Sequence, residues 1–74
     1  SAAVPSVSAE VSAILKDAMR RHRKGDAEGA RRGYERAIRI DPGDGDAHGL
    51  LAMLETDLGR LAVAEGHARK AISA

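Results

Sequence analysis

The sequence predicts an all-α fold in which about four helices form two antiparallel helix-turn-helix units. Three observations carry this prediction. The chain is rich in alanine and contains one aromatic residue, Tyr34, so its core must be built from small and aliphatic side chains, which suits closely packed helices. Apolar residues recur at three- and four-residue steps, which is the period of a helix. Identical residues also recur at a spacing of 34 positions.

The first helix is expected to run from about residue 9 to residue 24, after a flexible segment 1–8. Ser8 is a suitable N-cap because its hydroxyl can accept a hydrogen bond from a backbone N–H of the first turn. Gly25 supplies the left-handed residue that commonly ends a helix. The positions predicted to face the core are Val11, Ile14, Leu15, Ala18 and Met19.

A second helix is expected over about 27–40, with Asp26 as its N-cap. It ends at Asp41-Pro42, because proline cannot continue a helix and disfavours helical geometry in the residue before it. Its predicted inner face comprises Ala27, Ala30, Tyr34, Ala37 and Ile38.

Two glycines, Gly29 and Gly33, lie four residues apart on this second helix. They have two interpretations. Either they allow the backbones of two helices to approach closely, or they weaken the helix by about 1 kcal/mol each relative to alanine.

The polar run that follows predicts a turn, in which Asp44 or Asp46 can cap a third helix of about 46–58. Gly59 is expected to end that helix, and a fourth helix then covers about 61–73. The residues predicted to face inward are Leu50, Leu51, Leu54 and Leu58 from the third helix, and Leu61, Ala64, Ala68, Ala71 and Ile72 from the fourth.

The 34-residue spacing divides the chain into two similar units, 9–42 and 43–74. Comparing residues 9–40 with those 34 positions later gives seven identities in 32 pairs. The matches fall where antiparallel helices must approach closely and where a turn needs a positive φ. They are Ala13/Ala47, Ala18/Ala52, Met19/Met53, Gly25/Gly59, Ala30/Ala64, Ala37/Ala71 and Ile38/Ile72.

A helix-turn-helix unit of this length and spacing resembles the tetratricopeptide repeat (TPR). Residues 37–42, AIRIDP, are similar to the Ala-x4-Pro step that closes the repeat, and residues 25–30, GDAEGA, to the turn that enters its second helix. The resemblance covers about residues 11–74 and implies an α–α superhelix. It also implies a scaffold that binds a peptide or protein in a groove formed by the first helix of each repeat. The matching groove positions are Ser12, Leu15, Met19, His22, Arg23, Asp46, Gly49, Met53, Thr56 and Asp57.

The end of the second unit predicts a further contact surface. Helical repeats bury a continuous core only by stacking, so two repeats without a capping helix leave one edge uncovered. We expect self-association as a homo-oligomer, or a larger parent protein, to cover this edge. On the predicted fourth helix the edge comprises Ala64, Ala68, Ala71 and Ile72.

Charge is distributed unevenly along the chain. Residues 16–39 contain nine lysines and arginines against four acidic residues, a local charge of +5, whereas residues 41–74 contain three against six, a local charge of −3. Nucleic-acid binding through the basic first hairpin is therefore the alternative function. The composition disfavours it, because one tyrosine offers little stacking surface and the chain has neither Asn nor Gln to bind base edges.

The densest basic run, RRHRK at residues 20–24, cannot form a single patch, because five successive helical residues sweep more than one turn. His22 and Arg23 are expected to face the groove, and Lys24 to lie at the solvated end of the helix. Arg21 is expected to extend past Tyr34 or to pair with a glutamate of the second helix.

The sequence contains no arrangement typical of catalysis or metal binding. The absence of cysteine excludes thiolate nucleophiles, thiolate metal sites and disulfides. His22, His48 and His67 are 26 and 19 residues apart, unlike the ligands of a helical metal site. The run 43–46, GDGD, lacks the Gly-Lys-Ser/Thr of a phosphate loop and the final glutamate of a calcium loop. We therefore expect no enzymatic activity, no cofactor and no metal.

The first residues, SAAVPSVS, lack the charged and apolar regions of a signal peptide, and no apolar run has the length of a membrane span. We expect a soluble, cytoplasmic protein without a membrane partner.

Overall fold

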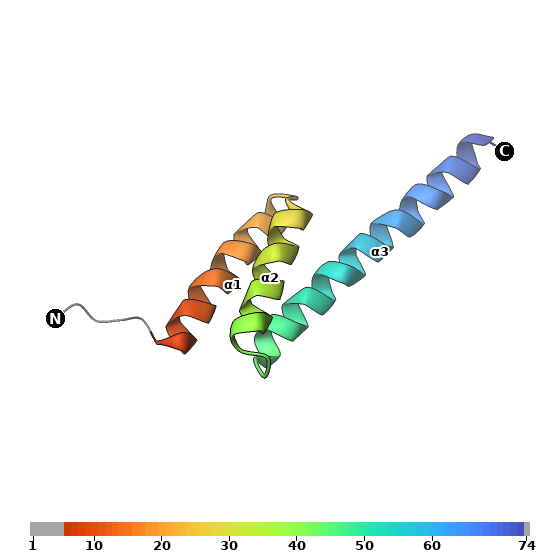
Figure 1. Cartoon of the computed structure of the whole chain (residues 1–74). Helices are drawn as coiled ribbons and strands as arrows, with labels where there is room; N and C mark the ends of the chain where they lie inside the picture. The colour runs from red at the N-terminus through yellow and green to blue at the C-terminus, as the bar shows by residue number, and fades with distance from the viewer. Residues whose placement is uncertain (1–5, 74) are drawn as a thin grey trace.

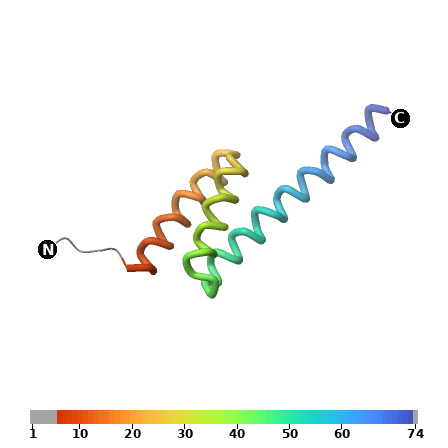
Figure 2. The backbone as a smooth tube through the Cα atoms, viewed as in Figure 1, coloured from red at the N-terminus to blue at the C-terminus, as the bar shows by residue number. Residues whose placement is uncertain are grey.

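The computed structural model describes residues 6–73, which form three helices: α1 (Val7–Arg23), α2 (Ala27–Ile40) and α3 (Gly45–Ser73). The first two form an antiparallel hairpin, and α3 leaves the hairpin and projects far beyond it (Figure 1). The molecule is elongated, with principal extents of 68 × 22 × 13 Å (Figure 2). The all-α prediction is confirmed for the described residues. Residues 1–5 of the expected flexible segment 1–8 lie outside them.

Local signals set both ends of α1. The Oγ of Ser6 accepts a hydrogen bond from the backbone N–H of Ala9 at 3.1 Å, and the Ser6 carbonyl accepts one from the N–H of Glu10 at 2.9 Å. The prediction of Ser8 as N-cap is therefore wrong. Ser6 has an extended backbone, as an N-cap residue should, and with Ser6 in this role the helix begins at Val7 instead of residue 9 and still has a capped first turn. At the other end Gly25 has a φ of +86°, as the sequence predicts.

Helix α2 occupies the predicted range 27–40. The Oδ1 atom of Asp26 caps it by accepting a hydrogen bond from the N–H of Gly29 at 2.9 Å. A Cβ on Gly33 would lie 2.7 Å from the Cβ of Ala18 on α1, closer than side-chain carbons come to one another. Of the two interpretations of the glycine pair, close backbone approach therefore holds for Gly33.

The core lies where the hairpin meets the first half of α3. Tyr34 is fully buried at its centre, and Ala30 and Ala37 flank it on α2. Most predicted core positions are buried or half-buried, but Met19 is 36% exposed because it lies at the open edge between α1 and α3. The buried apolar side chains are those of Val11, Leu15, Ala18, Ala30, Tyr34, Ala37, Ala47 and Leu54.

The predicted third and fourth helices are a single helix of 29 residues, so the prediction of four helices is wrong. Its N-cap is Asp44, whose Oδ1 accepts hydrogen bonds from the N–H groups of Asp46 and Ala47 at 2.9 and 3.2 Å. The helix continues through Gly59, where the 34-residue spacing predicts a turn. The two glycines differ in the residue that follows them. Asp26 follows Gly25 and caps a new helix, whereas Arg60 follows Gly59 and has no acceptor for the amides of a new first turn, so the helix continues.

The second half of α3, residues 59–73, is uncovered. Every residue in this range is exposed except Gly66, which is half-exposed. Three large apolar side chains are prominent: Leu61 is 56% exposed, Val63 62% and Ile72 85%. The inner face that the sequence predicts for a fourth helix therefore has nothing packed on it, and the second helix-turn-helix unit expected from the TPR resemblance is not formed.

Candidate functional site

An open groove with two lobes lies between α1 and the first half of α3. The lobe near the start of both helices has a volume of about 710 Å³, and the second lobe about 460 Å³. Met19, Leu50 and Met53 line both lobes. The predicted groove residues Ser12, Leu15, Asp46 and Gly49 lie in the first lobe, and His22, Arg23 and Asp57 in the second.

Thr56 is the predicted groove residue that lies apart from both lobes. Its hydroxyl donates a hydrogen bond to the carbonyl of Ala52, one turn back on α3, at 2.9 Å. This local bond engages its only donor within its own helix. The structure thus brings the other predicted groove positions together, and their role in binding stays a prediction.

His22 links all three helices at the second lobe. Its Nε2 atom lies 3.0 Å from Oδ2 of Asp57 on α3, and its Nδ1 atom lies 3.4 Å from the hydroxyl of Tyr34 on α2. Because a carboxylate only accepts hydrogen bonds, Nε2 is the donor to Asp57, and in the neutral ring Nδ1 is then free to accept from Tyr34. The two rings meet edge to face, with centroids 6.3 Å apart. No sequence spacing indicated this contact, since the His22 and Asp57 partners are 35 residues apart.

Burial changes the acidity of the tyrosine at this junction. The Tyr34 side chain is 0% exposed, so its ionised form would have to exist away from water. This desolvation raises the pKa of the Tyr34 phenol above its ordinary value of 10.0, and the nearby Arg23 charge offsets part of the increase.

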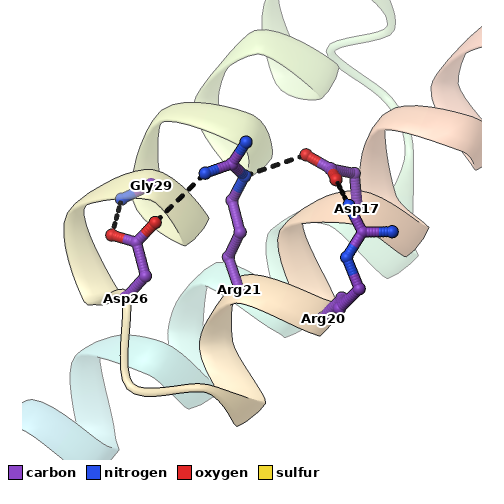
Figure 3. A network of polar contacts seen from close by, with 5 residues as sticks. All are labelled: Asp17, Arg20, Arg21, Asp26 and Gly29. Carbon is purple, nitrogen blue, oxygen red and sulfur yellow. Dashed lines mark hydrogen bonds and ion pairs between the residues drawn. The ribbon is translucent and has the colours of Figure 1, made fainter.

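A second polar cluster joins the end of α1 to the start of α2 (Figure 3). Asp17 accepts hydrogen bonds from Arg20 and from Nε of Arg21, the latter at 2.9 Å, and Arg21 also donates to Oδ2 of Asp26 at 3.2 Å. The hydrogen bond from Arg21 lowers the pKa of Asp17, and the Gly29 amide, followed by Arg21, lowers that of Asp26. The expectation that Arg21 extends past Tyr34 or pairs with a glutamate of the second helix is therefore wrong.

Arg31 ties α2 to α3. It donates a hydrogen bond to Glu55 and lies 3.9 Å from Glu28 of its own helix. The hydrogen bond to Glu55 raises the pKa of the Arg31 guanidinium. Arg20, Arg21 and Arg31 are thus engaged with carboxylates, which partly neutralises the basic hairpin.

The predicted self-association residues lie together on the uncovered half of α3. Ala64, Ala68, Ala71 and Ile72 are all exposed, and their three- and four-residue steps place them on one side of the helix. Leu61 extends this side by one more turn. The structure therefore presents an apolar stripe of Leu61, Ala64, Ala68, Ala71 and Ile72, whose role in association stays a prediction.

Within residues 6–73 no three His, Asp or Glu side chains gather in a way that could hold a metal ion. Nor does any helix in this range combine the length and the apolar character needed to cross a lipid bilayer.

In comparisons with known proteins, the chain matches no protein-family model, no curated protein and no solved structure.

Proposed function

We propose that this chain is a non-enzymatic self-association module whose contact surface is the uncovered half of α3. One observation carries the proposal: the apolar side of α3 continues beyond the point where the hairpin covers it. Leu50, Leu54 and Leu58 are packed against the hairpin core. Leu61 and Ile72 continue on the same side of the helix and are exposed.

The energetics favour covering this stripe. Helical segments of this length are marginal in water without tertiary packing, and most helix stability in proteins comes from burying an apolar face. Burial of a large aliphatic side chain contributes roughly 1.5–3 kcal/mol. A second copy has the same uncovered stripe, so pairing two copies covers both surfaces at once.

Light scattering over a dilution series tests the proposal. The native chain is expected to have a mass above that of the 7.8 kDa monomer at high concentration and to dissociate on dilution. Ile72→Lys, which places a charge in the stripe, should move the transition to higher concentration by about tenfold or more, since burying an unpaired charge is costly.

Val63→Lys is the matched control. Val63 is as exposed as Leu61, but its position in the helical period lies well away from the stripe, so this variant should associate like the native chain. A native chain that remains monomeric at every concentration would reject the proposal.

The groove between α1 and α3 supports a second candidate function, the binding of a peptide in the manner of a TPR scaffold. Met19 and Met53 line both lobes, and methionine side chains adapt to varied partners. Peptides that bind can be selected from a displayed library with the Ile72→Lys variant as the target. These peptides should lose affinity when Met53 of the target is also replaced by Lys. They should keep their affinity when Val63 is replaced by Lys instead. Peptides whose affinity does not change with Met53→Lys would exclude the groove as the binding site.

Nucleic-acid binding is the less supported alternative. Arg20, Arg21 and Arg31 form ion pairs with carboxylates, and the only tyrosine is buried rather than available for stacking. We expect no retention of RNA or DNA at low salt in a filter assay. Retention that falls steeply with salt would reinstate this function.

A further inference from the structure

We infer that the groove between α1 and α3 binds a partner helix of about three turns, with acidic side chains on one flank of its apolar stripe and basic side chains on the other. This inference rests on the second candidate function, peptide binding in the groove, and specifies the conformation and the charge pattern of the peptide. Three observations lead to it: the apolar middle of the groove, the side chains that the sequence lacks, and the opposite charges of the two walls.

The middle of the groove disfavours an extended ligand. Met19, Leu50 and Met53 line both lobes, so a ligand that spans the groove must cross them. None of these side chain types donates a hydrogen bond, and the methionine sulfur is only a weak acceptor. The backbone groups of α1 and α3 beside them bond within their own helices. An extended peptide would therefore bury backbone N–H and C=O groups without partners, which is costly.

A helical ligand avoids this cost, because its backbone groups bond to one another. The composition of the chain favours the same conformation. Asn and Gln side chains can offer both a donor and an acceptor to an extended backbone, and the sequence has neither. An amphipathic helix needs an apolar strip to lie on, which Leu50 and the two methionines provide.

The α1 wall of the groove is basic. Lys16 lines the first lobe and Arg23 the second, and both are exposed. Within the described part of the chain neither forms an ion pair, whereas Arg20, Arg21 and Arg31, which line neither of these lobes, are all paired with carboxylates. Lys16 and Arg23 are seven residues apart, or about 10 Å along the helix, and can therefore meet two carboxylates on one flank of a partner helix.

The α3 wall is acidic. Asp46 lines the first lobe and is exposed, and Asp57 lines the second with 48% of its side chain exposed. The two are eleven residues apart, which is about 16 Å or three turns of helix. Asp44, at the start of the same wall, caps α3. No lysine or arginine of the described part of α3 lines either lobe.

The two walls together determine the charge pattern of the ligand. A helix that lies along the groove presents one flank to α1 and the other to α3. Carboxylates on the first flank meet Lys16 and Arg23, and amino or guanidinium groups on the second meet Asp46 and Asp57. A uniformly acidic or uniformly basic helix would place like charges against one of the walls, which disfavours it.

Selection from a displayed library of random peptides tests the inference. The native chain is the target, and the Met53→Lys variant serves to discard peptides that bind outside the groove. Met53 is 54% exposed, so this substitution leaves the core intact. The remaining peptides should have apolar residues at three- and four-residue steps, acidic residues on one flank and basic residues on the other. Their circular dichroism should show a gain of helicity on mixing with the chain. Peptides that gain no helicity on binding would overturn the inference.

Charge reversal tests which flank faces α1. Lys16→Glu should weaken the binding of a selected peptide about fivefold, since attraction at an exposed pair becomes repulsion. A lysine in place of the peptide's acidic residue that faces position 16 should restore the affinity for this variant. Lys24→Glu is the matched control, because it makes the same charge change at the end of the same helix and lines neither lobe. Equal effects of Lys16→Glu and Lys24→Glu would overturn the charge pattern.

These outcomes separate the inference from the function on which it rests. If no selected peptide depends on Met53, the groove function and the inference fail together. Peptides that depend on Met53, but bind without becoming helical or bind the Lys16→Glu variant as tightly as the native chain, retain the function and reject only the inference.

Discussion

At the scale of single residues, Tyr34 has the most defined environment in the molecule. It is the only aromatic residue of the chain and is completely buried, and its hydroxyl lies next to His22 at the junction of the three helices. Any spectroscopic signal from tyrosine therefore reports on the core without interference from tryptophan.

The titration of Tyr34 gives the first prediction. Because burial raises the phenol pKa above 10.0 in the folded state, the stability that depends on the neutral phenol is complete below pH 10.0 and is lost as pH rises through the folded pKa. Tyrosinate absorbance should appear at higher pH in native buffer than in denaturant. Equal titration curves in the two solvents would contradict the burial of Tyr34, and Tyr34→Phe should weaken the alkaline loss of stability.

Gly33 provides the second prediction. A Cβ at this position would lie 2.7 Å from Ala18 Cβ, so Gly33→Ala forces α1 and α2 apart. We expect a loss of about 1–3 kcal/mol in the free energy of unfolding, as for other overpacked cores. Gly49→Ala is the control, because its Cβ would meet nothing within 4 Å and alanine favours the helix. Thermal unfolding of both variants measures the difference, and equal effects would show that the contact tolerates a methyl group.

At the scale of elements, the helices that the sequence predicts well are those with a local signal at each end. Asp26 caps α2 directly after Gly25 ends α1, and both signals can be read from neighbouring residues. The division of α3 at Gly59 is predicted from the glycine and from the repeat spacing, with no capping residue after it. A glycine permits a turn but does not impose one, so without a following cap the helix continues at a cost of only about 1 kcal/mol relative to alanine.

The candidate groove was predictable for a different reason. Met19, Arg23 and Met53 follow from the positions that the TPR resemblance assigns to first helices, and the start of α3 keeps that position beside α1. The link between His22 and Asp57 was not predictable, because it depends on the angle at which α3 crosses the hairpin. Sequence spacing carries no information about that angle.

Gly25 and Gly59, which lie 34 residues apart, provide the third prediction. Gly25→Ala should destabilise the chain by about 1–2 kcal/mol, because alanine at a φ of +86° is strained. Gly59→Ala should stabilise α3 by up to about 1 kcal/mol and increase helicity, because this residue is helical and its Cβ would meet nothing within 4 Å. Circular dichroism during thermal unfolding tests both variants. A loss of stability in Gly59→Ala would mean that the chain turns there.

At the scale of the whole molecule, the packed core and the projecting part of the chain are different segments. The hairpin and the first half of α3 contain all the buried residues of the described chain, and the second half of α3 projects beyond them as about 20 Å of exposed helix. Tertiary stability and the proposed association therefore depend on different parts of the chain.

Truncation after Leu58 gives the fourth prediction. The shortened chain should keep Tyr34 buried, because the core residues are retained, and its melting temperature should not change with protein concentration. The full chain should melt at higher temperature as concentration rises, since association stabilises the folded state by mass action. Calorimetry at several concentrations compares the two. A melting temperature of the full chain that does not change with protein concentration would argue against association. Exposure of Tyr34 on truncation would show that the core depends on residues 59–73.

The uncovered half of α3 should also be the part of the described chain most open to proteases, because its residues are exposed. Arg60, Arg69 and Lys70 lie in this exposed segment, where trypsin can cleave once the helix opens locally. Partner copies would shield the same segment. Under the proposed association, protein lifetime would depend on abundance. Dilute chains would be trimmed near Arg60 and lose the proposed contact surface, whereas concentrated chains would protect one another.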